Sequence, residues 1–303
     1  MTPQDYDYLR KMLRARSGLT LSAEKQYLVE SRLLPLARKN AMTTLIELVA
    51  AIRTAPQGPL AQAVVEAMTT NESFFFRDKI PFEHFKDIIL PALLTARAKE
   101  KRLRIWCNAC STGQEPYSLA IILDGMREQL AGWQIEILAT DLSADVLTRA
   151  KIGLYSQFEV QRGLPIQMLV KYFTQVNEQW QIAPEIRGKV DFRAFNLLNE
   201  FTAFGVFDAV FCRNVLIYFD QETKTGVLNR LVRSVAGDGY LVLGAAETVV
   251  GLTDSFKPMR DHRGLYVVNP APAKAAVKPL HLASPSLAPA APVSLRIAVS
   301  AKR

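Results

Sequence analysis

One stretch decides the fold, and it runs Leu103-Arg104-Ile105-Trp106-Cys107-Asn108-Ala109-Cys110-Ser111-Thr112-Gly113-Gln114-Glu115. Its first five residues are mostly apolar, which is typical of a strand, and Ser111-Thr112-Gly113 is typical of a turn. A helical pattern then continues from about Glu115 to Gln129. A strand that enters a helix through a short turn of small residues indicates the first unit of an α/β sheet.

The same alternation continues along the chain as far as residue 268. Apolar runs predict further strands at 134–139, 190–195, 207–212, 239–243 and 264–268, and helices at 145–150 and 221–235. Strands that alternate with helices predict an open parallel sheet, and we assign residues 71–269 to one α/β domain. Residues 153–190 have the wrong length for a simple crossover, so we interpret them as an insertion.

Residues 1–70 show only helical patterns, and no strand is predicted before residue 100. Tyr6, Leu9, Met12 and Leu13 keep the helical spacing up to Ser17-Gly18. A second helix is predicted from an N-cap at Ser22 toward Lys39-Asn40, although Pro35 should kink or break it. Two more helices fit 43–53 and 59–69, so the sequence predicts a small all-α domain.

Composition excludes several classes of protein. The 303 residues are 49% hydrophobic and 22% charged, which is ordinary for a globular protein and excludes a mainly disordered or collagen-like chain. There is no run of 18 apolar residues, so no transmembrane helix is expected. The polar start, Met1 to Arg10, predicts no signal peptide, and three cysteines fit a reducing cytoplasm.

The net charge of +8 resides at the two ends of the chain. Residues 1–70 carry +3, residues 270–303 carry +5, and residues 71–269 are neutral. A broad phosphate-tracking groove on the main body is therefore not expected. Residues 270–303 contain six prolines and ten alanines without hydrophobic periodicity, which predicts a disordered basic tail.

Polar residues follow the predicted strands at the edge where a parallel sheet binds ligands. The turn at Ser111-Thr112-Gly113 has one glycine instead of the three of a dinucleotide fingerprint, so a nucleoside without phosphates fits better. Asp141 follows the second strand, where an acid accepts hydrogen bonds from ribose hydroxyls; its alternative role is a helix N-cap. Arg213-Asn214 directly follows the strand predicted at 207–212, at the same edge of the sheet. S-adenosylmethionine, which has a ribose and a sulfonium but no phosphate, fits this pattern.

Four stretches resemble the chemotaxis receptor methyltransferase family, CheR-type, and the resemblance covers about residues 5–268. They are TNESFFFR (70–77), CSTGQEPYS (110–118), Ala139-Thr140-Asp141 and FDAVFCRNVLIYF (207–219). The resemblance implies a Rossmann-like methyltransferase sheet with a small β-subdomain inserted within about 153–195. It also implies methyl transfer from S-adenosylmethionine to glutamate side chains on the cytoplasmic helices of chemoreceptors, which gives methyl esters and S-adenosylhomocysteine.

The resemblance also implies roles for single residues. Glu115 would face the methionine amino group, Asp141 would hold the ribose, and Asn196-Leu197 would flank the adenine. Arg77 and Tyr218 would lie near the methyl group as catalytic residues, and their alternative roles are a helix-start cation and a core tyrosine. No metal is expected. The complete cofactor site implied by the motifs is Asn71, Ser73 (often threonine in the family), Arg77, Glu115, Asp141, Asn196, Leu197, Arg213 and Asn214.

The implied chemistry needs no general base. A glutamate with a pKa of about 4.3 is already ionised at pH 7. Alignment and desolvation of the two reactants supply roughly 7–11 kcal/mol. This agrees with the sequence, because none of His84, His262 and His281 lies beside the motifs.

Other readings of the motifs are weaker. Cys107-x-x-Cys110 has redox or half-zinc spacing, but Cys212 stands alone and no second pair exists. No Asp/Asn-Pro-Pro-Tyr/Phe element follows residue 212, which disfavours an adenine-specific DNA methyltransferase. Two alternatives stay open: a non-catalytic module that binds S-adenosylmethionine or its product, and a methyltransferase for another acceptor.

The sequence also makes predictions about partners. Lys25, Arg32 and Lys39 recur every seven residues and would dock acidic receptor helices from one helix face, the alternative being a solvated edge. Some family members bind a pentapeptide at the receptor C-terminus through a Gly-x-x-Gly-x-x-Arg turn in the inserted subdomain. The matching stretch, 173–187, contains no glycine, so no pentapeptide tether is expected. We expect a monomer that binds neither nucleic acid nor membrane.

Overall fold

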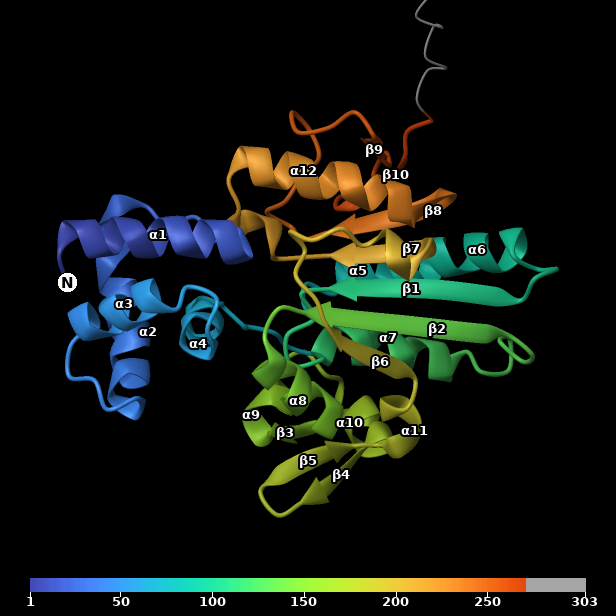
Figure 1. Cartoon of the computed structure of the whole chain (residues 1–303). Helices are drawn as coiled ribbons and strands as arrows, with labels where there is room; N and C mark the ends of the chain where they lie inside the picture. Colours follow the sequence, from blue (N-terminus) through green and yellow to red (C-terminus); the bar gives the residue numbers. More distant parts are fainter. Residues whose placement is uncertain (271–303) are drawn as a thin grey trace, which may run out of the picture. The chain divides into compact units, whose positions relative to one another are not determined.

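The computed structural model describes residues 1–270. The predicted tail, apart from Pro270, lies outside the described residues. Figure 1 shows the helices and strands along the chain. Among the helices of the described part, none has both the length and the apolar character needed to cross a membrane.

Four helices form the N-terminal part, and no strand occurs before residue 100 among the described residues. Gly18 ends the first helix in the left-handed conformation (φ 76°), where its N–H donates to the carbonyl of Arg14. Pro35 does not break the second helix, because that helix is held by the buried residues Val29, Leu33 and Ala37 while Pro35 itself is exposed. The helices are α1 (Pro3–Ser17), α2 (Gln26–Lys39), α3 (Leu45–Thr54) and α4 (Pro59–Met68).

Seven strands form the main sheet in the order β6-β2-β1-β7-β8-β10-β9. The inner strand β1 pairs in parallel with β2 on one side and β7 on the other. The strand order therefore reverses between β1 and β7, which is where open α/β sheets bind ligands. The strands are β1 (Arg102–Asn108), β2 (Gln134–Asp141), β6 (Val190–Ala194), β7 (Phe207–Cys212), β8 (Val235–Leu243), β9 (Phe256–Pro258) and β10 (Leu265–Val268).

Helices cover both faces of this sheet (Figure 1). Residues of α7 (Gln114–Gly125) and of the helical segment 80–96 pack with Ile105 and Cys107 of β1 on one face. Residues of α12 (Gln221–Leu231) pack with Trp106 on the other face. The alternation of side chains along β1 thus builds two hydrophobic clusters and leaves the carboxyl ends of the strands for polar groups.

Two features of the α/β part differ from the expectation. The prediction of a parallel sheet was wrong at one edge, because β10 runs antiparallel to β8 and to β9. No helix lies between β8 and β10 to carry a parallel crossover. The sequence patterns also left 80–96 unassigned, where α5 (Ile80–His84), a π-helical turn (Phe85–Ile89) and α6 (Leu90–Ala96) form one helical segment.

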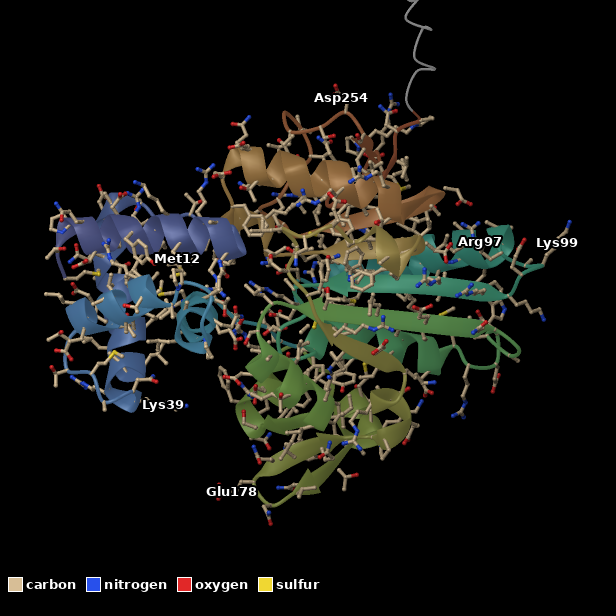
Figure 2. All side chains as sticks on the ribbon, viewed as in Figure 1. Met12, Lys39, Arg97, Lys99, Glu178 and Asp254 are labelled. Atoms are coloured by element: carbon tan, nitrogen blue, oxygen red, sulfur yellow. The ribbon has the colours of Figure 1, made fainter. Side chains whose placement is uncertain are left out.

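The predicted insertion contains a small antiparallel sheet of order β3-β5-β4, formed by β3 (Leu154–Ser156), β4 (Phe173–Val176) and β5 (Gln179–Ile182). The short hairpin between β4 and β5 carries Glu178 at its tip (Figure 2), and Asn177 takes a positive φ of 54°. The inserted β-subdomain predicted from the family resemblance is therefore present. Its helices are α9 (Gln157–Gln161), α10 (Ile166–Tyr172) and α11 (Pro184–Arg187), and α8 (Ala144–Ile152) precedes it.

Candidate functional site

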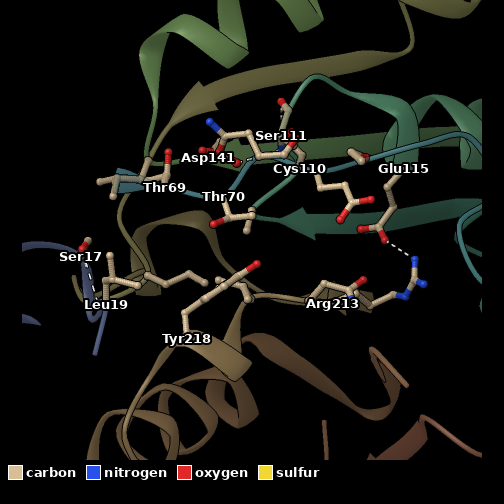
Figure 3. A pocket seen from close by; sticks show the side chains of 18 of the residues that line it. Ser17, Leu19, Thr69, Thr70, Cys110, Ser111, Glu115, Asp141, Arg213 and Tyr218 are labelled. Atoms are coloured by element: carbon tan, nitrogen blue, oxygen red, sulfur yellow. Dashed lines mark hydrogen bonds and ion pairs between the residues drawn. The ribbon is translucent and has the colours of Figure 1, made fainter. Parts of the chain in front are cut away.

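One pocket opens at the carboxyl ends of β1, β2 and β7 (Figure 3). Residues from six separate parts of the sequence meet there: 17–19, 69–77, 109–115, 141–142, 195–197 and 213–219. All ten residues that the sequence analysis named for the cofactor and for catalysis line this pocket: Asn71, Ser73, Arg77, Glu115, Asp141, Asn196, Leu197, Arg213, Asn214 and Tyr218.

Asp141, the last residue of β2, is buried and holds two neighbouring loops. One carboxylate oxygen accepts the N–H of Ser111 at 2.8 Å, and the other accepts the N–H of Ser143 at 2.9 Å. Burial raises the pKa of Asp141, although backbone N–H groups, with that of Ser143 first, oppose this effect. A carboxylate has about four acceptor positions. Asp141 therefore keeps acceptor capacity on the pocket side after it has bound both loops.

Glu115 and Arg213 form a buried ion pair at the other side of the pocket (Figure 3). Nη1 of Arg213 lies 2.6 Å from Oε2 of Glu115, and Nη2 donates to the carboxylate of Asp78 and to the carbonyl of Arg77. Burial raises the pKa of Glu115, and the nearby guanidinium of Arg213 opposes the shift. The pair joins the start of α7 to the end of β7 and to the segment around residue 77.

Arg77 lies on a segment with unusual backbone conformation. Phe76, Asp78 and Lys79 have positive φ values of 51°, 69° and 52°. Nη1 of Arg77 donates to the carbonyl of Glu72 at 2.7 Å, and the guanidinium carbon lies 5.6 Å from the centre of the Phe74 ring. A guanidinium has five N–H donors, so one internal hydrogen bond leaves most of the Arg77 donors for a ligand in the pocket.

The N-terminal helices take part in the pocket, which the sequence patterns did not indicate. Ser17 and Leu19, at the end of α1, line the pocket beside Asn196. The side-chain amide of Asn196 donates to the carbonyl of Arg16 at 2.6 Å, and the N–H of Thr20 donates to the carbonyl of Tyr218 at 2.9 Å. Asn196 and the backbone at Tyr218 are thus hydrogen-bonded directly to the segment at the end of α1.

The three predicted docking residues differ in their surroundings. Lys25, just before α2, and Lys39, at its end, are exposed (Figure 2 labels Lys39). Arg32 is half-buried, and its guanidinium donates to the carbonyls of Met68 and Thr69 at 2.7 and 3.0 Å and to the hydroxyl of Thr70. Arg32 therefore has a structural role at the end of α4, next to the segment that enters the pocket.

Comparison with protein families agrees with this arrangement. Residues 71–265 match the model described as "CheR methyltransferase, SAM binding domain", and residues 4–69 match "CheR methyltransferase, all-alpha domain". The chain belongs to the CheR methyltransferase family. It is 43% identical to "Chemotaxis protein methyltransferase 1" of Pseudomonas aeruginosa over 86% of this chain and 96% of that protein. It is 41% identical to "Chemotaxis protein methyltransferase Cher2" of Pseudomonas putida over the same shares.

Members of the CheR family act in chemotaxis as S-adenosylmethionine-dependent methyltransferases, and this chain does so as well. The pocket fits the cofactor by the chemistry of its acids. Asp141 offers free acceptor positions for ribose hydroxyls. Oε2 of Glu115 accepts a hydrogen bond from Arg213. Oε1 of Glu115 has no hydrogen bond within residues 1–270, so it suits the ammonium group of the methionine part of the cofactor.

Several pocket residues of this CheR chain were not found from the sequence. Ser17 and Leu19 come from the N-terminal helical part, so the rule that ligands bind at strand ends does not point to them. Ser111 lay inside the quoted turn, but its N–H bond to Asp141 depends on contact between two strands. Among residues 1–270 no three side chains of His, Cys, Asp or Glu are grouped so that they could hold a metal ion.

The raised pKa of both buried acids predicts a pH effect on cofactor binding. Burial makes Asp141 and Glu115 take up protons at a higher pH than free carboxyl groups, whose values are 3.8 and 4.5. We expect the affinity for S-adenosylhomocysteine to fall on acidification with a midpoint above these values. Calorimetry in a pH series measures this. An affinity that stays constant down to pH 4 in folded protein would contradict it.

Proposed function

We propose that this enzyme transfers the methyl group of S-adenosylmethionine to glutamate side chains of chemoreceptor cytoplasmic helices. When bound, the cofactor supplies a methyl group activated by its sulfonium. The supporting observation is the set of side chains in the pocket: the Tyr218 hydroxyl and most N–H groups of Arg77 have no partner within residues 1–270, and neither His84 nor His262 lines the pocket. His84 and His262 instead pack against each other, with ring centroids 5.2 Å apart.

The residues present suit an acceptor that is already ionised. A glutamate carboxylate needs no base at neutral pH. Free N–H groups of Arg77 would orient this carboxylate, and the Tyr218 hydroxyl, which has no hydrogen bond within residues 1–270, would donate to it (Figure 3). The buried Glu115–Arg213 pair would hold the walls of the pocket in place while water is excluded.

The direct test is incubation with S-adenosylmethionine labelled in its methyl group and chemoreceptor cytoplasmic fragments. Methyl esters hydrolyse in mild base, so label on glutamate is released as methanol, whereas methyl groups on nitrogen stay attached. A receptor fragment with its methylated glutamates changed to alanine serves as the control. Base-stable label, or no transfer by a protein that binds S-adenosylhomocysteine, would contradict the proposal.

We also propose that the exposed lysines at the ends of α2 steer the acidic receptor helices. Because Arg32 is bound to the end of α4, the sharper test is the double variant Lys25→Glu/Lys39→Glu. We expect a higher KM for receptor at low salt and unchanged affinity for S-adenosylhomocysteine. Lys99→Glu/Lys101→Glu, which makes the same charge change at the exposed residues before β1, is the control. Equal kinetics of the two variants would refute the docking face.

The absence of a pentapeptide tether remains our prediction, although its structural reason needs correction. The lack of glycine was expected to make positive-φ turns costly, but Asn177 takes a positive φ of 54°, a conformation that asparagine tolerates. The edge strand β4 is also free on its outer side within the described residues. The prediction now depends only on the missing Gly-x-x-Gly-x-x-Arg pattern.

Titration of a receptor-tail pentapeptide into the protein is therefore expected to give no saturable heat. S-adenosylhomocysteine, titrated into the same sample, provides the positive control for folded protein. Micromolar binding of the pentapeptide, with increased hydrogen-exchange protection of β4, would overturn the prediction. We further expect the enzyme to act as a monomer in the cytoplasm, which sedimentation and cell fractionation would check.

A further inference from the structure

Glu247 is a buried carboxylate whose hydrogen bonds all come from backbone N–H groups. Oε2 accepts the N–H groups of Asn214 and Gly244, both at 2.8 Å. Oε1 accepts those of Val215 at 2.9 Å and Leu216 at 2.7 Å. Its exposed fraction is only 9%. One side chain thus satisfies four backbone donors that have no strand partner.

These donors belong to the two loops that follow β7 and β8. Asn214 and Val215 line the cofactor pocket, and the same loop leads on to Tyr218 and Phe219, which line it as well. Asn214 has a positive φ of 58°, a conformation that costs free energy unless its surroundings hold it. Glu247 itself is not among the residues that line the pocket. It therefore acts on the pocket through the backbone of the loop.

The arrangement requires a carboxylate of this length beside a glycine. Four N–H groups need two oxygens with two acceptor positions each, which a carboxylate provides and an amide does not. A Cβ on Gly244 would lie 2.8 Å from Oε2 of Glu247 and 3.0 Å from the backbone nitrogen of Asn214. Gly244 thus permits the close approach of the two loops, and Glu247 fixes it.

We propose that Glu247 is a positioning residue for the cofactor site: it sets the backbone of Asn214 and Val215 and thereby the path of the chain to Tyr218. The proposal deepens the proposed function, because it concerns the same pocket. It does not depend on which acceptor is methylated, since its main readout is binding of S-adenosylhomocysteine.

The test compares Glu247→Gln with Asp208→Asn. Glutamine keeps the shape, but its NH2 group faces two of the four N–H donors. Asp208 lies at the opposite end of β7, where it is also buried and accepts the N–H of Arg104 at 2.8 Å and Nε of Arg97 at 2.9 Å. Both variants should unfold at lower temperature. If Glu247 only stabilises the fold, Glu247→Gln and Asp208→Asn should change the affinity for S-adenosylhomocysteine equally.

We expect Glu247→Gln to bind S-adenosylhomocysteine at least tenfold more weakly and to have a higher KM for S-adenosylmethionine, measured well below the unfolding temperature. Asp208→Asn should retain wild-type affinity and KM. Wild-type affinity of folded Glu247→Gln, or equal losses in both variants, would overturn the proposal. If Glu247→Gln does not fold, Gly244→Ala replaces it, with the same expected loss and the same refuting result.

The two proposals fail in different ways. If the wild-type protein does not bind S-adenosylhomocysteine, the cofactor site and with it the proposed function are refuted. If the wild-type protein binds it and Glu247→Gln binds it equally well, only the positioning role is refuted. If the wild-type protein binds S-adenosylhomocysteine but transfers no methyl group to any receptor fragment, the proposed acceptor is contradicted. The positioning role of Glu247 is not affected by that result.

Discussion

Arg77→Ala is expected to lower kcat about 100-fold, the scale observed when one preorganised donor to a reacting group is removed. The affinity for S-adenosylhomocysteine should stay within a few-fold of wild type. The structural reason is the position of Arg77: it lines the pocket, and within residues 1–270 its guanidinium has one hydrogen bond, to the carbonyl of Glu72. Steady-state kinetics with receptor fragments, together with calorimetry, separates the two effects.

Two further variants distinguish catalysis from packing. Arg77→Lys keeps the charge but loses the planar pair of donors, so we expect only partial recovery of kcat. Arg162→Ala is the control, because Arg162 lies 4.1 Å from the centre of the same Phe74 ring and pairs with Glu72 but does not line the pocket. Normal turnover by Arg77→Ala, or the same loss in Arg162→Ala, would show that Arg77 only packs.

The sequence predicted those parts of the fold that depend on local patterns. Gly18 marks the end of α1 because a left-handed residue there suits glycine, and the inner parallel strands β1, β2, β7 and β8 contain buried apolar runs. In the edge strand β6 only Phe192 is buried. The antiparallel direction of β10 was missed, because a single apolar run has the same pattern in either direction. Pro35 was expected to disturb α2, and tertiary packing of its neighbours prevailed.

The residues of the candidate site also fall into those that sequence patterns predict and those that they do not. Asp141 and Arg213 could be found, because each stands at the carboxyl end of a strand and these ends meet at one edge of a parallel sheet. Ser17 could not, because its role arises from contact between distant segments, whereas Glu247 was overlooked. Glu247 follows β8 by only a few residues, so the strand-end rule extended to that strand would have named it. Arg32 shows the converse: regular spacing suggested docking, while its three hydrogen bonds are internal.

Asp141→Ala should weaken binding of S-adenosylhomocysteine by roughly 10- to 150-fold, since hydrogen bonds to a charged group are worth about 1.5–3 kcal/mol. The structure adds a second effect. The N–H groups of Ser111 and Ser143 lose their acceptor in this variant, so the loops at residues 111 and 143 should loosen. Calorimetry gives the affinity, and hydrogen exchange of the two amides reports on the loops.

Controls separate these two effects on affinity. Glu159→Ala removes a carboxylate that likewise accepts a backbone N–H, that of Ser156 at 2.9 Å, but lies outside the pocket. We expect this variant to lose local protection and to keep cofactor affinity. Adenine alone, which lacks the ribose, should bind Asp141→Ala and wild type with similar affinity if the acid contacts the ribose. Wild-type affinity for S-adenosylhomocysteine in folded Asp141→Ala would refute the ribose contact and leave Asp141 as a loop anchor only.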